Sequence, residues 1–378
     1  MTTVRIVIAP QEFKGTLTAR EAVRAMAEGA AKALAGADIV EVPLSDGGPG
    51  LLEVVLTAKD GRAQTTTVRD PLGRNVNAEW GLLADGSSVI EMAAAAGLWR
   101  VSENERDPSS ATTYGVGQLI LEALGHSCRR IVVGLGGSAT NDGGAGMAAA
   151  LGARFLDGAG GMLPPGGGSL ARLNRIEVSG LDRRLSEVEV IAATDVRNPL
   201  CGPNGSSLVY GKQKGASPGQ AAELDAALEH YATIVEHDLG IRVIEAPGAG
   251  AAGGLGAGLI AFAGAEIRSG FDVVAEIVGL RERIEGADLV LTGEGRLDGQ
   301  TGFGKTVSGV VELANESSVP VLVIPGSLGD GWEALSSDVN AIEPVVGELA
   351  TMEEAMARPS ETLALAVRRA VARWRRRS

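Results

Sequence analysis

The sequence predicts an α/β protein with two domains, one of them discontinuous, and three observations support this. The 378 residues are more than one hydrophobic core ordinarily organises. The chain opens with strand-like and helical segments in β-α-β-α order, which favours a parallel sheet. The same texture returns near the C-terminus, after a region with the alternating pattern of antiparallel strands. We therefore expect a Rossmann-like parallel-sheet domain over 1–70 plus 285–378, with a mixed α/β domain inserted over 71–284.

The N-terminal segment supports the parallel sheet. A buried strand over 4–9 ends at Pro10, and a helix is expected over 19–34. Thr18 precedes that helix as its N-cap, and Glu21 completes a capping box. A second strand and helix are expected over 38–42 and 50–58.

The remaining elements follow from periodicity and turn residues. Alternating strands are expected over 63–69, 75–83 and 87–91, and further strands over 130–134, 188–193, 287–292 and 319–324. Helices are expected over 112–124, 147–151, 218–237 and 305–315, with two more at the C-terminus.

A glycine-rich run over 134–146 follows the strand over 130–134 and leads into a small-residue helix. Such a loop can hold an anion on backbone N–H groups and a helix dipole, because glycine has no Cβ to keep a phosphate away. Asp142 adds a hard oxygen ligand of the kind that Mg²⁺ prefers. The alternative is a tight turn without a ligand. We favour a ligand site because polar side chains are interleaved with the glycines.

Composition excludes several classes of function. The net charge of −13 argues against a nucleic-acid surface, although local basic groups can still bind an anionic substrate. Cys128 and Cys201 lack the spacing of a disulfide framework, and the N-terminus runs directly into a strand. No apolar run reaches the ~18 residues of a membrane span. We expect a reduced, cytoplasmic protein with neither nucleic-acid nor membrane partners.

Two glycine motifs match known patterns in an unfavourable context. Residues 299–306 fit the P-loop string, but the preceding strand ends near Thr292, so we interpret the match as coincidence, with Lys305 still a candidate phosphate ligand. Residues 248–253 fit G-x-G-x-x-G, but Pro247 interrupts the strand that a dinucleotide site requires. A tight glycine turn at a helix start is the favoured interpretation, and close approach to a substrate is the alternative.

Charged residues gather just beyond the ends of the expected strands. Carboxylates, lysine or arginine and glycine cradles are the components of phosphoryl transfer, which needs charge neutralisation and a carboxylate to accept a hydroxyl proton. The residues are Asp46, Asp142, Asp195, Glu294 and Asp298, and Lys14, Arg197, Lys214, Arg296 and Lys305.

Several of these motifs together resemble the bacterial glycerate kinase family. The most specific are Gly-Gly-Ser-Ala-Thr-Asn-Asp-Gly-Gly over 136–144 and Thr-Gly-Glu-Gly-Arg-Leu-Asp over 292–298. Segments 69–73, 91–95, 195–200, 213–216 and 247–256 agree with the family in the same order. The resemblance implies an ATP- and Mg²⁺-dependent kinase that converts D-glycerate to 2-phosphoglycerate, with its active site in the cleft between two α/β domains.

Each candidate residue has an expected role in such a kinase. Asp195 is expected to be the catalytic base, with Lys14 and Asp298 as further catalytic residues, and Asp142 and Glu294 as Mg²⁺ ligands. Substrate-binding residues are Arg197, Asp46, Gly253, Gly254 and Lys214. Nucleotide and phosphate contacts are expected from Gly136, Gly137, Ser138, Thr140, Asn141, Gly143, Gly144 and Lys305.

Two loops depart from the family pattern. Gln11 and Glu12 replace Asp-Ser in the first loop, and Pro49 replaces a Glu in the second. These departures leave open a kinase of another small hydroxy acid or polyol, or an inactive homologue acting as a binding protein. An NAD-dependent oxidoreductase rests on the glycine strings alone. We expect a small hydroxy acid and a nucleotide as ligands, and a monomer or homodimer.

Overall fold

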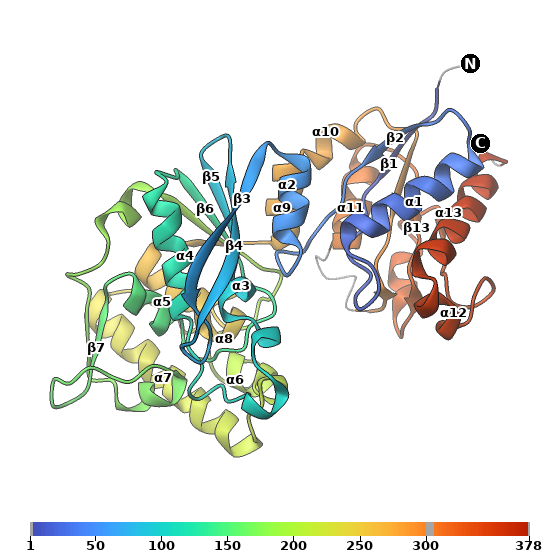
Figure 1. The fold of residues 1–378 in the computed structure, drawn as a ribbon. Coiled ribbons are helices and arrows are strands. Elements are labelled where there is room, and N and C mark those ends of the chain that lie inside the picture. Colours follow the sequence, from blue (N-terminus) through green and yellow to red (C-terminus); the bar gives the residue numbers. More distant parts are fainter. Residues whose placement is uncertain (1–2, 300–305, 377–378) are drawn as a thin grey trace. The chain divides into compact units, whose positions relative to one another are not determined.

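The computed structural model describes residues 3–299 and 306–376, which divide into two compact units. The first unit comprises Met1–Asp46, Glu53–Ala58 and Phe271–Ser378; the second comprises Gly47–Leu52 and Lys59–Gly270. Figure 1 shows the first unit in blue and orange to red, since it is built from both ends of the chain. These divisions differ from the expected boundaries at 70/71 and 284/285, because strand β3 (Gly61–Arg69) pairs within the sheet of the second unit.

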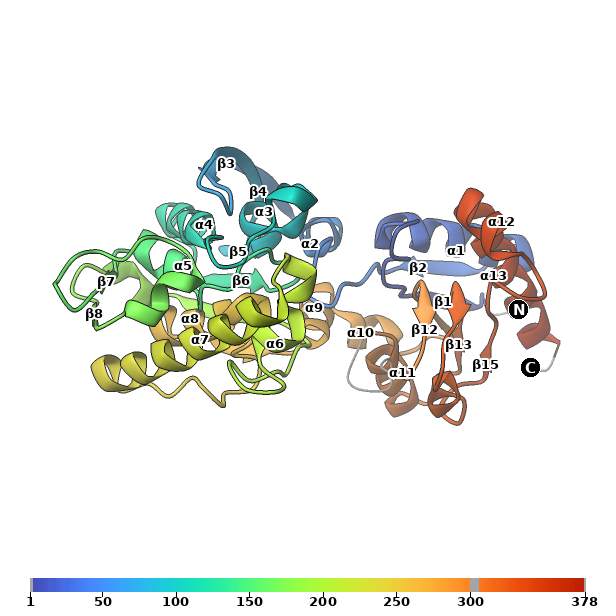
Figure 2. The same ribbon diagram turned by 90° about the horizontal axis from the view of Figure 1, so that it is seen from below.

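The first unit contains a parallel sheet in the order β15-β13-β11-β1-β2. Its strands are β1 (Arg5–Ile8), β2 (Asp38–Glu41), β11 (Leu289–Thr292), β13 (Val321–Val323) and β15 (Ala341–Ile342). Helices α1 (Ala19–Ala33) and α13 (Pro359–Arg375) pack their apolar faces with these strands into one core. Helix α11 (Thr306–Glu316) lies on the other face of the sheet (Figure 2).

Local sequence signals position these elements as predicted. The capping box of α1 is present, with Glu21 N donating to Thr18 Oγ1 over 3.2 Å and Thr18 N donating to Glu21 Oε2 over 2.9 Å. Smaller elements complete the unit: α2 (Leu51–Ala58) and α9 (Gly270–Val278), each shared with the second unit, and α10 (Leu280–Ile284), β12 (Arg296–Leu297), β14 (Ser327–Leu328) and α12 (Met352–Ala357).

The second unit contains a mixed sheet in the order β10-β9-β6-β5-β4-β3. Strands β3, β4 (Asn75–Leu83) and β5 (Ser87–Glu91) are antiparallel neighbours, as their alternating sequence predicted. Strands β5, β6 (Arg130–Gly134), β9 (Glu189–Ala193) and β10 (Glu266–Arg268) run parallel. Their carboxyl ends therefore meet at one edge of the sheet.

Helices and a hairpin complete the second unit. Helices α3 (Met92–Ala96) and α4 (Tyr114–Gly125) pack in the core that contains the sheet. A second core lies among α5 (Ala145–Ala150), α7 (Pro218–Leu239), α8 (Ala251–Ala263) and the hairpin of β7 (Arg154–Leu156) and β8 (Arg175–Glu177). The short helix α6 (Ser206–Tyr210) precedes α7.

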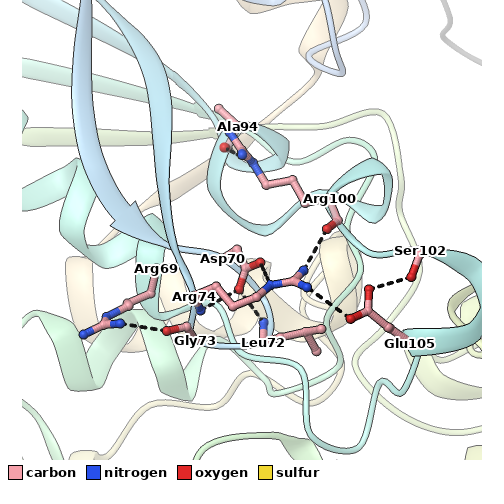
Figure 3. Close-up of polar contacts among 9 residues, drawn as sticks. All are labelled: Arg69, Asp70, Leu72, Gly73, Arg74, Ala94, Arg100, Ser102 and Glu105. Carbon is pink, nitrogen blue, oxygen red and sulfur yellow. Dashed lines mark hydrogen bonds and ion pairs between the residues drawn. The ribbon is translucent and has the colours of Figure 1, made fainter.

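The turn between β3 and β4 is organised by Asp70, whose side chain is buried (Figure 3). Asp70 Oδ1 accepts hydrogen bonds from Leu72 N and Arg74 N, both at 2.9 Å, and Oδ2 pairs with Arg74 Nε at 2.6 Å. The same guanidinium contacts Glu105 at 3.1 Å and donates to the carbonyl of Arg100 at 3.1 Å. This family-like segment therefore has a structural role in the hairpin.

Among the residues that the structure describes, no helix is both long enough and apolar enough to cross a membrane.

Candidate functional site

The carboxyl edge of the second unit's sheet carries polar side chains and main-chain turns. Glu91 ends β5, the run 134–146 follows β6, Asp195 lies two residues beyond β9, and Ser269 follows β10. Ligands of open α/β sheets bind at this edge.

Asp195 is held in a fixed orientation. Its Oδ1 atom accepts a hydrogen bond from Ser269 Oγ at 2.9 Å and another from Gly270 N at 2.8 Å. Asp195 is half-buried, whereas Arg197 is exposed two residues further along. A carboxylate oriented by two donors beside an exposed guanidinium is suited to accepting a proton from a bound hydroxy acid.

The turn 47–50 runs along the same edge. Gly47 packs so closely that a Cβ there would lie 2.8 Å from the carbonyl oxygen of Ala193. Glu91 Oε1 anchors the end of the turn, accepting from Gly50 N at 3.0 Å and Leu52 N at 2.8 Å. Pro49, which departs from the family pattern, is exposed in this turn.

The glycine run has an exposed part and a buried part. Gly136 is half-buried and Gly137 is exposed, while Thr140, Asn141 and Asp142 have no exposed surface. Only the first part can present its backbone to a ligand in this conformation. The sequence predicted ligand contacts over the whole run; the buried part instead packs within the unit.

Asp142 is the centre of the buried part. Its carboxylate accepts hydrogen bonds from Thr113 N at 2.8 Å, Thr113 Oγ1 at 2.9 Å, Gly144 N at 3.1 Å and Gly146 N at 3.2 Å. Burial raises the pKa of this carboxyl, and the hydrogen bonds oppose that shift. These donors hold the carboxylate within its loop, and the expected Mg²⁺ ligation by Asp142 stays a prediction.

The two glycine-rich runs of the second unit pack on each other. Gly143 N donates to the Gly253 carbonyl at 3.0 Å, and residues 252–254 turn through left-handed backbone conformations. A Cβ on Gly253 would collide with the carbonyl oxygen of Thr140. Gly143, Gly144, Gly253 and Gly254 are all buried, so here glycine permits close packing of two main chains, where the sequence suggested close approach of a ligand.

Lys214, expected to contact substrate, has only 2% of its surface exposed. Its ammonium donates to the Thr140 carbonyl at 2.7 Å. Burial lowers the pKa of Lys214 to about 7, and the negative charge of Asp142 opposes this shift.

The first unit carries the other predicted residues in loops beyond its strands. Lys14 is exposed after β1, and Glu294 and Asp298 are half-buried after β11. The parallel pairing of β12 with β14 fixes the loop after β11, where Arg296 Nε lies 3.8 Å from Asp298 Oδ2. Lys305 lies outside the described residues.

Glu12, one of the departures from the family pattern, is a half-buried carboxylic acid in the first loop. Burial raises its pKa, Asp46 raises it further, and Lys14 opposes the shift.

No cluster of three His, Cys, Asp or Glu side chains within residues 3–299 and 306–376 is arranged to hold a metal ion. Mg²⁺ is commonly bound through one or two carboxylates together with substrate phosphates, so the absence of such a cluster is compatible with its use.

Sequence reasoning missed the partners that orient the site. Ser269 and Gly270 hold Asp195, and Thr113 holds Asp142 from 29 residues away. The packing of distant segments in the fold brings these residues together, and no local pattern marks them.

The fold places polar side chains and exposed backbone at a sheet edge where α/β proteins bind their ligands, and comparison with known proteins identifies the family. Residues 6–375 match the glycerate kinase family. The chain is 45% identical over 365 residues to the glycerate kinase of Halalkalibacterium halodurans, covering 96% of both proteins. It is 45% identical over 354 residues to the glycerate 2-kinase of Escherichia coli K12, covering 93% of both. The chain belongs to the glycerate kinase family.

A solved structure agrees along the whole chain. A crystal structure described as a glycerate kinase 2 from Salmonella typhimurium LT2 superposes with a TM-score of 0.88 at 42% identity, covering 99% of both chains. The fold class predicted from the sequence, two α/β units with a parallel and a mixed sheet, is confirmed.

Proposed function

We propose that the protein transfers the γ-phosphoryl group of ATP to the 2-hydroxyl of D-glycerate. The family and the relatives named glycerate kinase and glycerate 2-kinase support the reaction. The observation that carries the mechanism is the Asp195 carboxylate, oriented by Ser269 and Gly270 at the carboxyl edge of the sheet.

In the proposed reaction Asp195 accepts the proton of the substrate hydroxyl. The hydroxyl oxygen forms a bond to the γ-phosphorus, the bond from that phosphorus to the β,γ-bridging oxygen breaks, and ADP leaves. The pKa of the base need not be high, because phosphoryl transfer depends mainly on positioning and charge stabilisation. Arg197, exposed beside Asp195, binds the substrate carboxylate through its planar fork of donors.

Phosphate and metal contacts are assigned to accessible groups. The backbone of Gly136 and Gly137 and the exposed Lys14 bind phosphate oxygens. Glu294 and Asp298 are half-buried carboxylates suited to Mg²⁺, directly or through water, and Asp46 faces substrate. Mg²⁺, when bound, neutralises the charge that develops on the transferred phosphoryl group.

Unpaired thiols at Cys128 and Cys201 suit a reducing cytoplasm, where we propose the protein acts as a monomer or homodimer. Burial raises the pKa of Cys201 to about 12, so its thiol stays protonated and unreactive.

A coupled ADP-release assay with D-glycerate, L-glycerate and larger hydroxy acids tests the activity, and phosphorus NMR of the product identifies the acceptor hydroxyl. Turnover of a larger acid without turnover of D-glycerate would overturn the substrate and implicate Glu12 and Pro49. Absence of turnover with every acid would leave a binding protein.

The variant Asp195→Asn tests the base. We expect kcat to fall about 10²–10⁴-fold, the usual contribution of a positioned general base. Asp85→Asn, in an exposed turn of the same unit, is the matched control and should keep wild-type kcat. An Asp195→Asn variant with full kcat would remove Asp195 from the mechanism.

A further inference from the structure

We propose that Lys214 is a positioning residue, whose buried ammonium fixes the Thr140 carbonyl and thereby the conformation of the glycine loop 136–144. The inference rests on the proposed function in one respect, namely that the exposed part of this loop binds phosphate.

The environment of Lys214 excludes direct contact with substrate in this structure. The side chain is among the largest fully buried ones, and its ammonium donates to a main-chain carbonyl within the same unit. Burying an amino group is unfavourable unless its hydrogen bonds compensate. A methionine would fill a similar volume without that cost, so the lysine points to a need for its hydrogen bond to the Thr140 carbonyl.

The Thr140 carbonyl is a junction of three segments. Lys214, from the short 3-10 helix Lys212–Lys214, reaches it at 2.7 Å. On the opposite run, Gly253 lies so close that a Cβ would strike the same oxygen, and its carbonyl accepts from Gly143 N at 3.0 Å. Removing the amino group would leave this carbonyl against packed main chain without its hydrogen bond from Lys214.

The loop is held a second time two residues later. Asp142 is bonded to Thr113 at the start of α4, and it is the carboxylate whose charge acts on Lys214. The anchors at positions 140 and 142 lie three and five residues after Gly137, where the accessible part of the loop ends. Loss of the hydrogen bond from Lys214 to the Thr140 carbonyl would therefore change the backbone geometry of 136–138, while the hydrogen bonds of Asp142 maintain the fold of the unit.

Lys214→Met removes the donor while keeping the apolar stem, and Lys212→Met makes the same change at an exposed position of the same 3-10 helix. Both full-length variants are compared with wild type by thermal melting, by kcat at 25 °C with ATP and D-glycerate, and by hydrogen exchange over 138–146. We expect Lys214→Met to lose at least ~10-fold in kcat at a temperature where it is fully folded, and to exchange amides over 138–146 at least ~10-fold faster. Lys212→Met should match wild type in both.

Lys214→Gln keeps a neutral donor and should fall between Met and wild type in both measurements. If Lys214→Met does not fold, Lys214→Gln is compared with wild type by the same two measurements, kcat and hydrogen exchange over 138–146. A Lys214→Met variant with a lower melting temperature but wild-type kcat at 25 °C would overturn the positioning role. If wild type turns over no hydroxy acid, the proposed function fails, and the exchange measurement still decides whether Lys214 fixes the loop.

Discussion

Asp142 and Thr113 are bonded through both main chain and side chain: Thr113 N donates to Asp142 Oδ2 at 2.8 Å and Thr113 Oγ1 donates to both carboxylate oxygens. Thr113 Oγ1 also accepts from Met147 N at 2.9 Å, which links α4, the glycine loop and α5. This pair fixes the buried part of the loop.

Replacing Asp142 with Asn should destabilise the protein by about 2–4 kcal/mol. An amide has one acceptor oxygen where the carboxylate has two, so at least one buried donor loses its partner. The NH₂ group of the amide also brings a new donor into the buried site. Urea unfolding measures the change, with Asp60→Asn at an exposed position as control. A loss under ~0.5 kcal/mol would show that the buried network contributes little.

Gly253→Ala should cost more than about 3 kcal/mol or prevent folding. The added Cβ would meet the Thr140 carbonyl oxygen at a left-handed φ of +75°, so both collision and backbone strain oppose it. Gly264 has a similar φ of +62° but open space where an added Cβ would lie, and Gly264→Ala should cost only about 1 kcal/mol. Equal losses in the two variants, measured by denaturant unfolding, would refute the tight packing of the two runs.

The titration of Lys214 predicts how stability changes with pH. Its pKa is about 7 in the folded protein against an ordinary value of 10.5, so between these values the unfolded chain binds more protons and stability rises with pH. Wild type should gain up to about 1 kcal/mol per pH unit relative to Lys214→Met between pH 8 and 9.5. Parallel unfolding curves for the two proteins across this range would contradict a depressed pKa.

Asp70→Ala should destabilise the second unit by about 2–4 kcal/mol. Asp70 is 1% exposed and satisfies two main-chain N–H groups and the Arg74 guanidinium (Figure 3). Asp85→Ala removes a comparable but exposed turn contact, to Ser87 N at 2.9 Å, and should cost less than about 1 kcal/mol. Chemical denaturation of both variants measures their losses of stability. Equal losses would show that the hairpin tolerates removal of the buried Asp70 carboxylate.

The fold could be predicted from the sequence to a large extent because its signals are local. Alternation over 63–91 predicted β3, β4 and β5, and Thr18 with Glu21 predicted the start of α1. The division between units was placed differently, because the expected boundary at 70/71 separates β3 from its hairpin partner β4.

The candidate site was less predictable, and glycine is the reason. A glycine beside a strand end permits close approach of a phosphate or of a neighbouring main chain equally well, and the sequence does not distinguish these two uses. At Gly143 and Gly253 the close neighbour is main chain. The charge of Lys214 suggested a ligand contact, but in the structure its side chain donates to the Thr140 carbonyl of the loop. The roles of Asp195, Arg197, Lys14, Glu294 and Asp298 stay predictions.

The interleaving of the two units has a consequence for biosynthesis. In the first unit β1 pairs with β11, and Thr292 Oγ1 donates to the Ala9 carbonyl across 283 positions of sequence. At the usual ~5–20 residues per second of translation, β1 emerges roughly 15–60 s before its partner exists. During that interval the continuous stretch Lys59–Gly270 is complete on the ribosome. The nascent N-terminus, with its apolar strand uncovered, is therefore the stage at which we expect chaperones to be needed most.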